Sequence, residues 1–186
     1  MSFIETGLAG LLIFKPTILE DSRGYFFEAY NEQNFKNVGI DLRFVQDNQS
    51  SSSYGVIRGL HYQLNPYAQT KLVRVLSGTI LDVAVDIRKG SPSFGISYSI
   101  ELSDENQQQL LIPAGFAHGF SVLSEKAVIM YKCNNFYKKE SEAGISYNDP
   151  LINIDWRIPV GKEIVSEKDN QLPLLKDCKN NFDFKG

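Results

Sequence analysis

The sequence predicts an all-β protein, an antiparallel barrel or sandwich, and three observations support this class. Side chains alternate between apolar and polar through most of residues 40–135, which is the pattern of strands with one buried face. Short turns separate these segments, whereas parallel strands need crossovers of a dozen or more residues. Helix-forming stretches are scarce. The 186 residues suit a single domain, with the barrel at about residues 40–135 and both chain ends around it.

The alternation is clearest in TILDVAVDIRKG, residues 79–90. One row of this strand is apolar and is expected in the core, namely Leu81, Val83, Val85 and Ile87. The opposite row includes Asp82 and Asp86, and we expect both at solvent or at an interface. Further strands are expected in KLVRVLSG, SYSIEL, QQLLIP, GFSVL and AVIMYKC, separated by the breaker-rich segments GSPSFG, SDEN and SEK.

Two short helices are expected outside the barrel. In NEQNFKNVG, residues 31–39, Asn31 can cap the helix and Gly39 can end it. SEKDNQ, residues 166–171, begins with a capping serine and is ended by Pro173. The rest of the C-terminal part is predicted to wrap the barrel as turns and extended pieces. Taken alone, the triplet QDN suits a turn, and the serine run that follows it suits a flexible loop, one that could close over a substrate.

Composition narrows the function classes. The 19 Lys and Arg residues against 22 Asp and Glu residues give a formal charge of −3, so no global basic field favours nucleic acid or anionic membranes. Cys133 and Cys178 are far apart and few, which indicates a reducing compartment, although one disulfide stays an alternative. The apolar run at residues 7–14 is short and lacks a basic start. We expect a cytoplasmic protein without a membrane span.

The spacing in GVIRGLHYQ, residues 55–63, resembles the first motif of the cupins, and PAGFAH, residues 113–118, resembles the core of the second. In a metal-binding cupin, Gln63 would be a second histidine and Lys71 a glutamate. Divalent cations prefer imidazole and carboxylate ligands, whereas an ammonium adds like charge and has no lone pair. We therefore expect a cupin-like antiparallel β-barrel, a jelly roll with short peripheral helices, that binds no metal and uses His61 for other chemistry.

Five residues would converge in such a barrel. The frame places Arg58 and His61 on one strand, Lys71 on the next, His118 across the barrel, and Tyr131 on AVIMYKC. Together they can bind an anion, remove a proton, hold an oxyanion and return a proton, but they include no covalent nucleophile. This combination points to proton abstraction next to a carbonyl, and an epimerase needs a base and an acid on opposite faces of that carbon.

The chain resembles the dTDP-4-dehydrorhamnose 3,5-epimerase family in order over residues 5–175. The segments that carry the resemblance are DSRGYFFEAYN, VQDNQSSSSYGVIRGLHYQ, AQTKLVRVLSGTILDVAVDIRKGSPSFG, IPAGFAHGF, YKCNNFYKKESEAGISYNDP and SEKD. The resemblance implies a homodimer of cupin-like barrels without metal or nucleotide cofactor. It implies conversion of dTDP-4-dehydro-6-deoxy-glucose, a dTDP-4-keto-6-deoxyhexose, to dTDP-4-dehydro-rhamnose, a step in dTDP-L-rhamnose biosynthesis.

The family's residue roles transfer to matching positions of this sequence. His61 is then the base, Asp169 orients it, Lys71 stabilises the enolate, and Tyr131 is the opposing acid. The remaining implied positions bind substrate: Arg23 and Arg58 at the pyrophosphate; Glu28, Gln46, Asp47 and Asn48 at the nucleotide; Phe26 and Tyr30 as stacking surface; and His118, Tyr137, Glu142 and Lys168 around the pocket.

Other interpretations remain open at this point. Taken alone, His61 suits a core histidine, Tyr131 a packing residue, and Asp169 a carboxylate in the first turn of a helix. A related enzyme could epimerise only C3 or only C5, because pocket shape decides which carbon reaches the base, or could move the carbonyl as a ketoisomerase. A metal-dependent cupin and a non-catalytic sugar-binding cupin are further alternatives. The apolar run at residues 7–14 would suit exchange of a strand between subunits.

Overall fold

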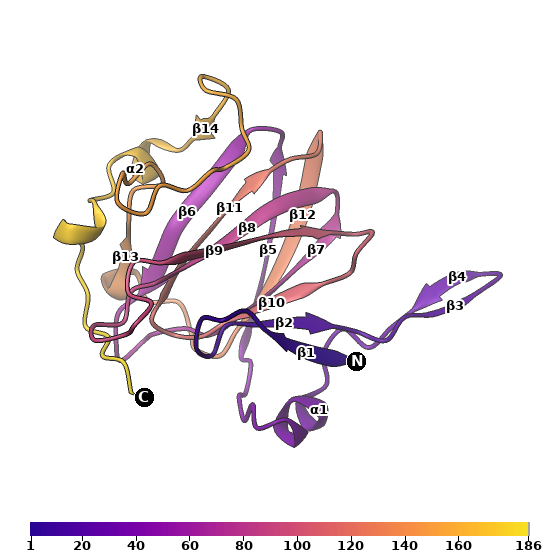
Figure 1. The fold of residues 1–186 in the computed structure, drawn as a ribbon. Helices are drawn as coiled ribbons and strands as arrows, with labels where there is room; N and C mark the ends of the chain where they lie inside the picture. Colours follow the sequence, from indigo (N-terminus) through magenta and orange to yellow (C-terminus); the bar gives the residue numbers. More distant parts are fainter. Residues whose placement is uncertain (186) are drawn as a thin grey trace.

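A computed structural model describes residues 1–185 of the protein as two facing antiparallel sheets (Figure 1). The first sheet contains, in spatial order, β1 (Ser2–Glu5), β2 (Leu12–Lys15), β10 (Gln109–Ile112), β7 (Lys71–Ser77), β12 (Lys126–Cys133) and β5 (Gln46–Ser53). The second contains β13 (Glu142–Gly144), β6 (Val56–Gln63), β11 (Phe116–Val122), β8 (Thr79–Asp86) and β9 (Ser97–Ser103), and β14 (Ile164–Val165) pairs in parallel with β6. The predicted all-β class is confirmed.

The remaining elements lie outside the two sheets. They are the hairpin of β3 (Leu19–Asp21) and β4 (Gly24–Phe26), the helices α1 (Glu32–Asn37) and α2 (Glu167–Asn170), and the 3₁₀ turns η1 (Lys139–Ser141) and η2 (Leu175–Asp177). The caps agree with prediction, because the Asn31 side chain accepts from the first turn of α1 and Ser166 accepts from the Asp169 N–H. Across residues 1–185, none of the helices has the length and apolar character needed to cross a membrane.

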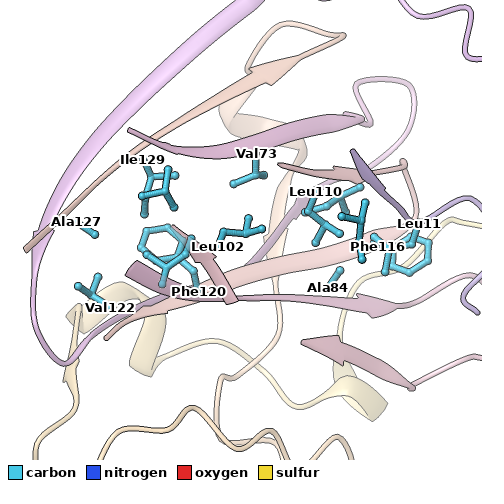
Figure 2. Packing of buried hydrophobic residues seen from close by; sticks show 14 residues of the cluster. Leu11, Val73, Ala84, Leu102, Leu110, Phe116, Phe120, Val122, Ala127 and Ile129 are labelled. Atoms are coloured by element: carbon cyan, nitrogen blue, oxygen red, sulfur yellow. The ribbon is translucent and has the colours of Figure 1, made fainter. Parts of the chain in front are cut away.

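Apolar side chains from both sheets meet between them (Figure 2). Val73 and Ile129 come from one sheet, and Phe116 and Phe120 come from the other. All four are at most 5% exposed, and full burial of such side chains contributes about 1.5–3 kcal/mol each. This packing fixes the distance between the sheets, and therefore the width of any cavity that the polar side chains line.

Both faces of β8 are buried, which corrects the expectation that one face meets solvent. The apolar row, with Leu81 and Val83, packs outside the barrel against C-terminal residues that include Trp156. The opposite row faces the barrel interior, and Asp82 and Asp86 are both 0% exposed. Period-two alternation describes the two faces of a strand correctly, but a segment distant in sequence covers the second face here.

The segment QDNQSSSS forms strand β5 over its whole length, so the interpretation of these residues as a turn and a flexible loop is wrong. It pairs with β12 without interruption, from Gln46 opposite Cys133 to Ser53 opposite Lys126. Serine, asparagine and aspartate have low strand propensity, but pairing with an apolar neighbour strand outweighs that preference. The alternate side chains of Gln46, Asn48, Ser50 and Ser52 are the shielded ones, and they give the barrel a polar inner row.

The buried carboxylate of Asp86, at the end of β8, is the centre of a hydrogen-bond network. Its carboxylate accepts from Arg88 Nε at 2.9 Å and Arg88 Nη2 at 2.7 Å, and from the hydroxyls of Ser91 at 2.6 Å and Ser93 at 2.7 Å. Burial by itself would raise the pKa of the Asp86 carboxyl, but these hydrogen bonds outweigh it and the pKa lies below its usual range. Because all of its partners come from the fold itself, we assign the buried Asp86 carboxylate a role in stability.

We predict that Asp86→Ala lowers the free energy of unfolding by about 3–5 kcal/mol, because it leaves a largely buried guanidinium without its partner. The Arg88 side chain is 13% exposed. Equilibrium denaturation by urea measures the change. The matched control is Asp41→Ala, since the Asp41 side chain is 82% exposed and its loss should stay within about 0.5 kcal/mol. Similar small losses in both variants would contradict the prediction.

Candidate active site

A β-bulge in β6 brings Arg58 and His61 to the same side of the strand. On the neighbouring strand β11, Phe120 pairs with Arg58 and His118 pairs with His61, so three steps of β6 oppose two steps of β11. The extra residue reverses the in-and-out alternation beyond it. Both side chains consequently line one cavity, although residues three apart on a regular strand face opposite sides.

Gly59 makes this bulge possible. Its φ is +133°, and a Cβ atom there would lie 2.5 Å from Cα of Gly119 on β11. A side chain is excluded both by that conformation and by the close approach of the two backbones. The freed N–H of Gly59 donates to Asp169 Oδ2 at 3.2 Å. The bulge therefore also anchors the carboxylate behind His61.

His61 and Asp169 form a hydrogen-bonded pair. The distance from His61 Nε2 to Asp169 Oδ1 is 2.7 Å, and Asp169 is 3% exposed. Burial raises the pKa of the Asp169 carboxyl, but hydrogen bonds from His61, Gly59 and Ser166 outweigh it and leave the pKa below its usual range. The ionised carboxylate accepts the Nε2–H, so Nδ1 of His61 carries the lone pair that can take a proton.

Lys71 and Tyr131 face His61 from the opposite sheet, on β7 and β12. The Nζ of Lys71 lies 5.9 Å from the centre of the Tyr131 ring and donates to the backbone carbonyl of His61 at 3.5 Å. Two adjoining cavities, of about 240 and 140 Å³, are both lined by His61, Lys71 and Tyr131. A base, a cation and a phenol thus surround one space from two sides.

Burial moves the pKa values of the two groups on the opposite sheet in opposite directions. It lowers the pKa of the Lys71 ammonium, with partial compensation from Cys133, Asp82 and Glu142. It raises the pKa of the Tyr131 phenol, against the effect of the Arg58 charge. Tyr131 therefore keeps its proton at neutral pH, as a proton donor requires, and Lys71 becomes a better hydrogen-bond donor to a developing oxyanion.

His118 belongs to a second histidine–carboxylate pair. Its Nε2 lies 2.7 Å from Asp82 Oδ1, and both residues are buried. Burial lowers the pKa of the His118 imidazole, despite the opposing effect of Asp82, so the ring is neutral at pH 7. His118 lies directly beside His61, because β11 pairs with β6 and the two histidines are register partners. It lies across the barrel from Lys71, which β7 of the other sheet carries.

Four predicted substrate residues form a connected rim on the larger cavity. The Gln46 side chain donates to Asn48 at 3.0 Å and accepts from the Tyr137 N–H at 3.1 Å. The Tyr137 hydroxyl donates to Glu142 Oε2 at 3.1 Å. Lys168 extends the chain by donating to Glu142 Oε1 at 2.7 Å. The structure therefore brings these five residues together, in contact with the space around His61.

Arg58 provides the cationic side of the site. Its Nε donates to the Ser52 hydroxyl at 3.1 Å, which leaves the terminal nitrogens of the guanidinium available. Arg58 lines the smaller cavity and also a third one of about 420 Å³ that contains Lys168 and Asp169. Lys71 also lines the smaller cavity, and Lys168 lines the third. The Arg58 guanidinium with a lysine ammonium in the same cavity suits the oxygens of a phosphate group.

The residues at the cupin ligand positions are engaged otherwise. The amide of Gln63 donates to the Tyr67 carbonyl at 2.7 Å and accepts from the Lys138 N–H at 2.6 Å. His61 and His118 each direct Nε2 at a carboxylate. Within residues 1–185, no group of three or more His, Cys, Asp or Glu side chains is arranged to hold a metal ion. This donor set does not fit a cupin metal.

A protein-family model for dTDP-4-dehydrorhamnose 3,5-epimerase matches residues 5–177. The chain belongs to this family. A curated relative from Shigella flexneri with the name dTDP-4-dehydrorhamnose 3,5-epimerase is 54% identical over 170 residues, which cover 91% of this chain and 93% of the relative.

Solved structures of epimerases of this family share the fold. The dTDP-4-dehydrorhamnose 3,5-epimerase from Elizabethkingia anophelis has a TM-score of 0.92 at 53% identity, over 95% of this chain and 97% of that one. The dTDP-6-deoxy-D-glucose-3,5-epimerase from Legionella pneumophila, solved in complex with dTDP-4-keto-L-rhamnose, has a TM-score of 0.89 at 48% identity, over 95% and 93%. The predicted cupin-like barrel is thereby confirmed.

Not every residue implied by the epimerase family reaches the site within one chain. Arg23 and Phe26 lie on the β3–β4 hairpin, which projects away from the barrel (Figure 1). Arg23 is paired there with Asp21 at 2.6 Å, and Phe26 is 70% exposed. Glu28 accepts from residues at the start of α1. Asp47 points to the outer face of β5, where its carboxylate pairs with Lys132.

The structure also adds residues to this epimerase site that sequence reasoning missed. Asp82 supports His118, Ser52 holds Arg58, and Gly59 supplies the bulge. Asp82 was expected at solvent or at an interface, and the serine run with Ser52 suited a loop. A charged residue inside an otherwise apolar strand pattern was the available signal for Asp82, since a buried carboxylate requires a partner. The run of serines offered no comparable signal.

Proposed function

We propose that the chain is a dTDP-4-dehydrorhamnose 3,5-epimerase that inverts C3 and C5 of dTDP-4-dehydro-6-deoxy-D-glucose, in the cytoplasm, as a step toward dTDP-L-rhamnose. The observation that carries this proposal is the placement of His61 and Tyr131 on opposite sheets, across a cavity that both line. Inversion at a carbon requires removal of a proton from one face and delivery to the other. The ligand of the Legionella relative, a dTDP-4-keto sugar, supports the substrate class.

The proposed reaction begins with proton abstraction at C3 or C5, each of which is next to the C4 ketone. Nδ1 of His61 accepts the proton, and the Asp169 carboxylate stabilises the imidazolium that forms. The electron pair of the broken C–H bond moves toward the ketone and produces an enolate. The Lys71 ammonium lines both cavities and can stabilise this developing negative charge.

Tyr131 completes the inversion. Its phenol donates a proton to the opposite face of the same carbon, and the enolate returns to the ketone. The phenolate then regains a proton from solvent as His61 releases one, which restores both groups. Base, acid and cation are all side chains of this chain, and a second cycle at the other α-carbon uses the same three groups.

Substrate incubated with the enzyme in deuterated water should acquire deuterium at both C3 and C5, which NMR measures directly. His61→Ala should abolish exchange at both carbons while binding of dTDP survives, because the base is lost and the nucleotide contacts remain. Tyr131→Phe should reduce product formation more than proton loss, since the base face is intact. No exchange at either carbon would refute the epimerase, and exchange at one carbon would identify a single-site enzyme.

The activity should fall at alkaline pH as Lys71 loses its proton. Burial lowers the pKa of Lys71. We therefore expect kcat/KM to decline at a pH below the ordinary lysine pKa of about 10.4. Lys71→Arg should move this alkaline limb upward because guanidinium stays charged. Lys71→Met should lower kcat by about 100- to 1,000-fold. The pH profiles of the three proteins test this, and an unchanged alkaline limb in Lys71→Arg would contradict it.

The projecting hairpin supports the homodimer implied by the family. A two-stranded hairpin alone is marginally stable, yet this one exposes Leu19 by 61%, Tyr25 by 60% and Phe26 by 70%. Such apolar exposure is characteristic of an interaction surface. We propose that a second copy of the chain covers the hairpin, and that Arg23, Phe26 and Glu28 thereby reach the substrate bound by the partner subunit.

Subunit complementation tests this arrangement. A heterodimer of His61→Ala and Arg23→Glu chains, isolated with two affinity tags, should recover about half of the wild-type activity, because one of its two symmetric sites has neither substitution. The matched control pairs His61→Ala with Asp169→Asn. Both of these changes lie on the base side of one chain, so that heterodimer should stay inactive. Equal inactivity of the two heterodimers would refute the shared site.

A further inference from the structure

The inner row of β5 contains one residue without an assigned contact. Gln46, Asn48, Ser50 and Ser52 alternate along this strand and are its shielded side chains. Three of them hydrogen-bond to neighbouring groups. The hydroxyl of Ser50 is shielded from solvent and has no hydrogen-bond partner among the described residues. Ser50 is thus the member of the row whose polar group is free to bind something else.

An unpartnered hydroxyl of this kind is uncommon, because a buried polar group without a hydrogen bond costs about 1–3 kcal/mol. Within residues 1–185, the buried side-chain atoms that lack a partner are Ser50 Oγ and Asp82 Oδ2. Ser50 lines the 140 Å³ cavity together with His61 and Tyr131, and Asp82 supports His118, which lines the same cavity. Ser50 Oγ therefore lies at the proposed site of reaction, and Asp82 lies behind a histidine of the same cavity.

The strand register places Ser50 beside the proposed acid. On β12, Tyr131 pairs with Asn48 and Ile129 pairs with Ser50. Ser50 and Tyr131 are consequently diagonal neighbours on the inner face, at a typical Cα separation of about 7–8 Å. A ligand that spans His61 and Tyr131 lies within reach of the Ser50 hydroxyl.

We propose that Ser50 is a further substrate-binding residue whose hydroxyl bonds to a hydroxyl group of the hexose ring held between His61 and Tyr131. This inference rests on the proposed function, since it concerns the sugar that the epimerase transforms. A serine hydroxyl can both donate and accept, which matches a sugar hydroxyl, whereas the ketone only accepts and faces Lys71. Ser50 would then favour hydroxylated hexoses over deoxy analogues, because a site built for a hydroxyl rejects ligands that lack it.

A comparison of three substrates tests the inference: the dTDP-4-keto-6-deoxyhexose itself and its analogues without the C2 or the C3 hydroxyl. Ser50→Ala should lower kcat/KM for the parent sugar by about tenfold, and should have little effect on the analogue that lacks the bonded hydroxyl. Ser50→Cys, of similar size but a weak hydrogen-bonding group, should behave like Ser50→Ala. The matched control is Ser51→Ala, the exposed neighbour on the outer face of β5, which should retain wild-type kinetics with all three substrates.

Equal losses with all three substrates would overturn the inference and indicate a role through Tyr131, and an unchanged rate with the parent sugar would also overturn it. The melting temperature of each variant verifies that the barrel is intact. Failure of the proposed function is distinguishable, because the wild-type enzyme would then exchange no proton in deuterated water. Wild-type exchange with no selective effect of Ser50→Ala would refute the Ser50 assignment alone.

Discussion

Strand β6 carries one residue more than the stretch of β11 beside it, and the candidate site depends on that residue. The bulge turns Arg58 and His61 toward the same cavity, and its free N–H at Gly59 holds the carboxylate that orients His61. A regular strand would leave one of the two side chains outside the barrel. The cation and the proposed base could then not act on one ligand.

In this barrel, different groups of residues stabilise the fold and form the candidate site. The apolar cluster between the sheets and the second cluster under the C-terminal segment hold the strands in place. Into this frame the chain buries two carboxylates, Asp82 and Asp169, each paired with a histidine. Buried carboxylates of this kind are costly unless they have partners. This energetic cost falls at the cavity, where the carboxylates hold the two histidines in a fixed orientation for moving protons.

Much of the fold could be predicted because its signals are local. Strand alternation, helix caps and the glycine spacing around His61 each depend on residues within a few positions of one another. Predictions failed where distant segments meet. The C-terminal wrap covers the second face of β8, and pairing with β12 makes β5 a strand despite its polar composition. No local pattern reports either contact.

For the site, the amino-acid sequence predicted the chemical groups, since His61, Lys71, Tyr131 and Asp169 follow from spacing and family resemblance. The arrangement of those groups depended on tertiary structure. Which sheet carries His118, which face of β5 looks inward, and why the β3–β4 hairpin stands apart are all outcomes of strand order and register. These are properties of long-range pairing, whose free energy comes from contacts between segments that the chain brings together only when it folds.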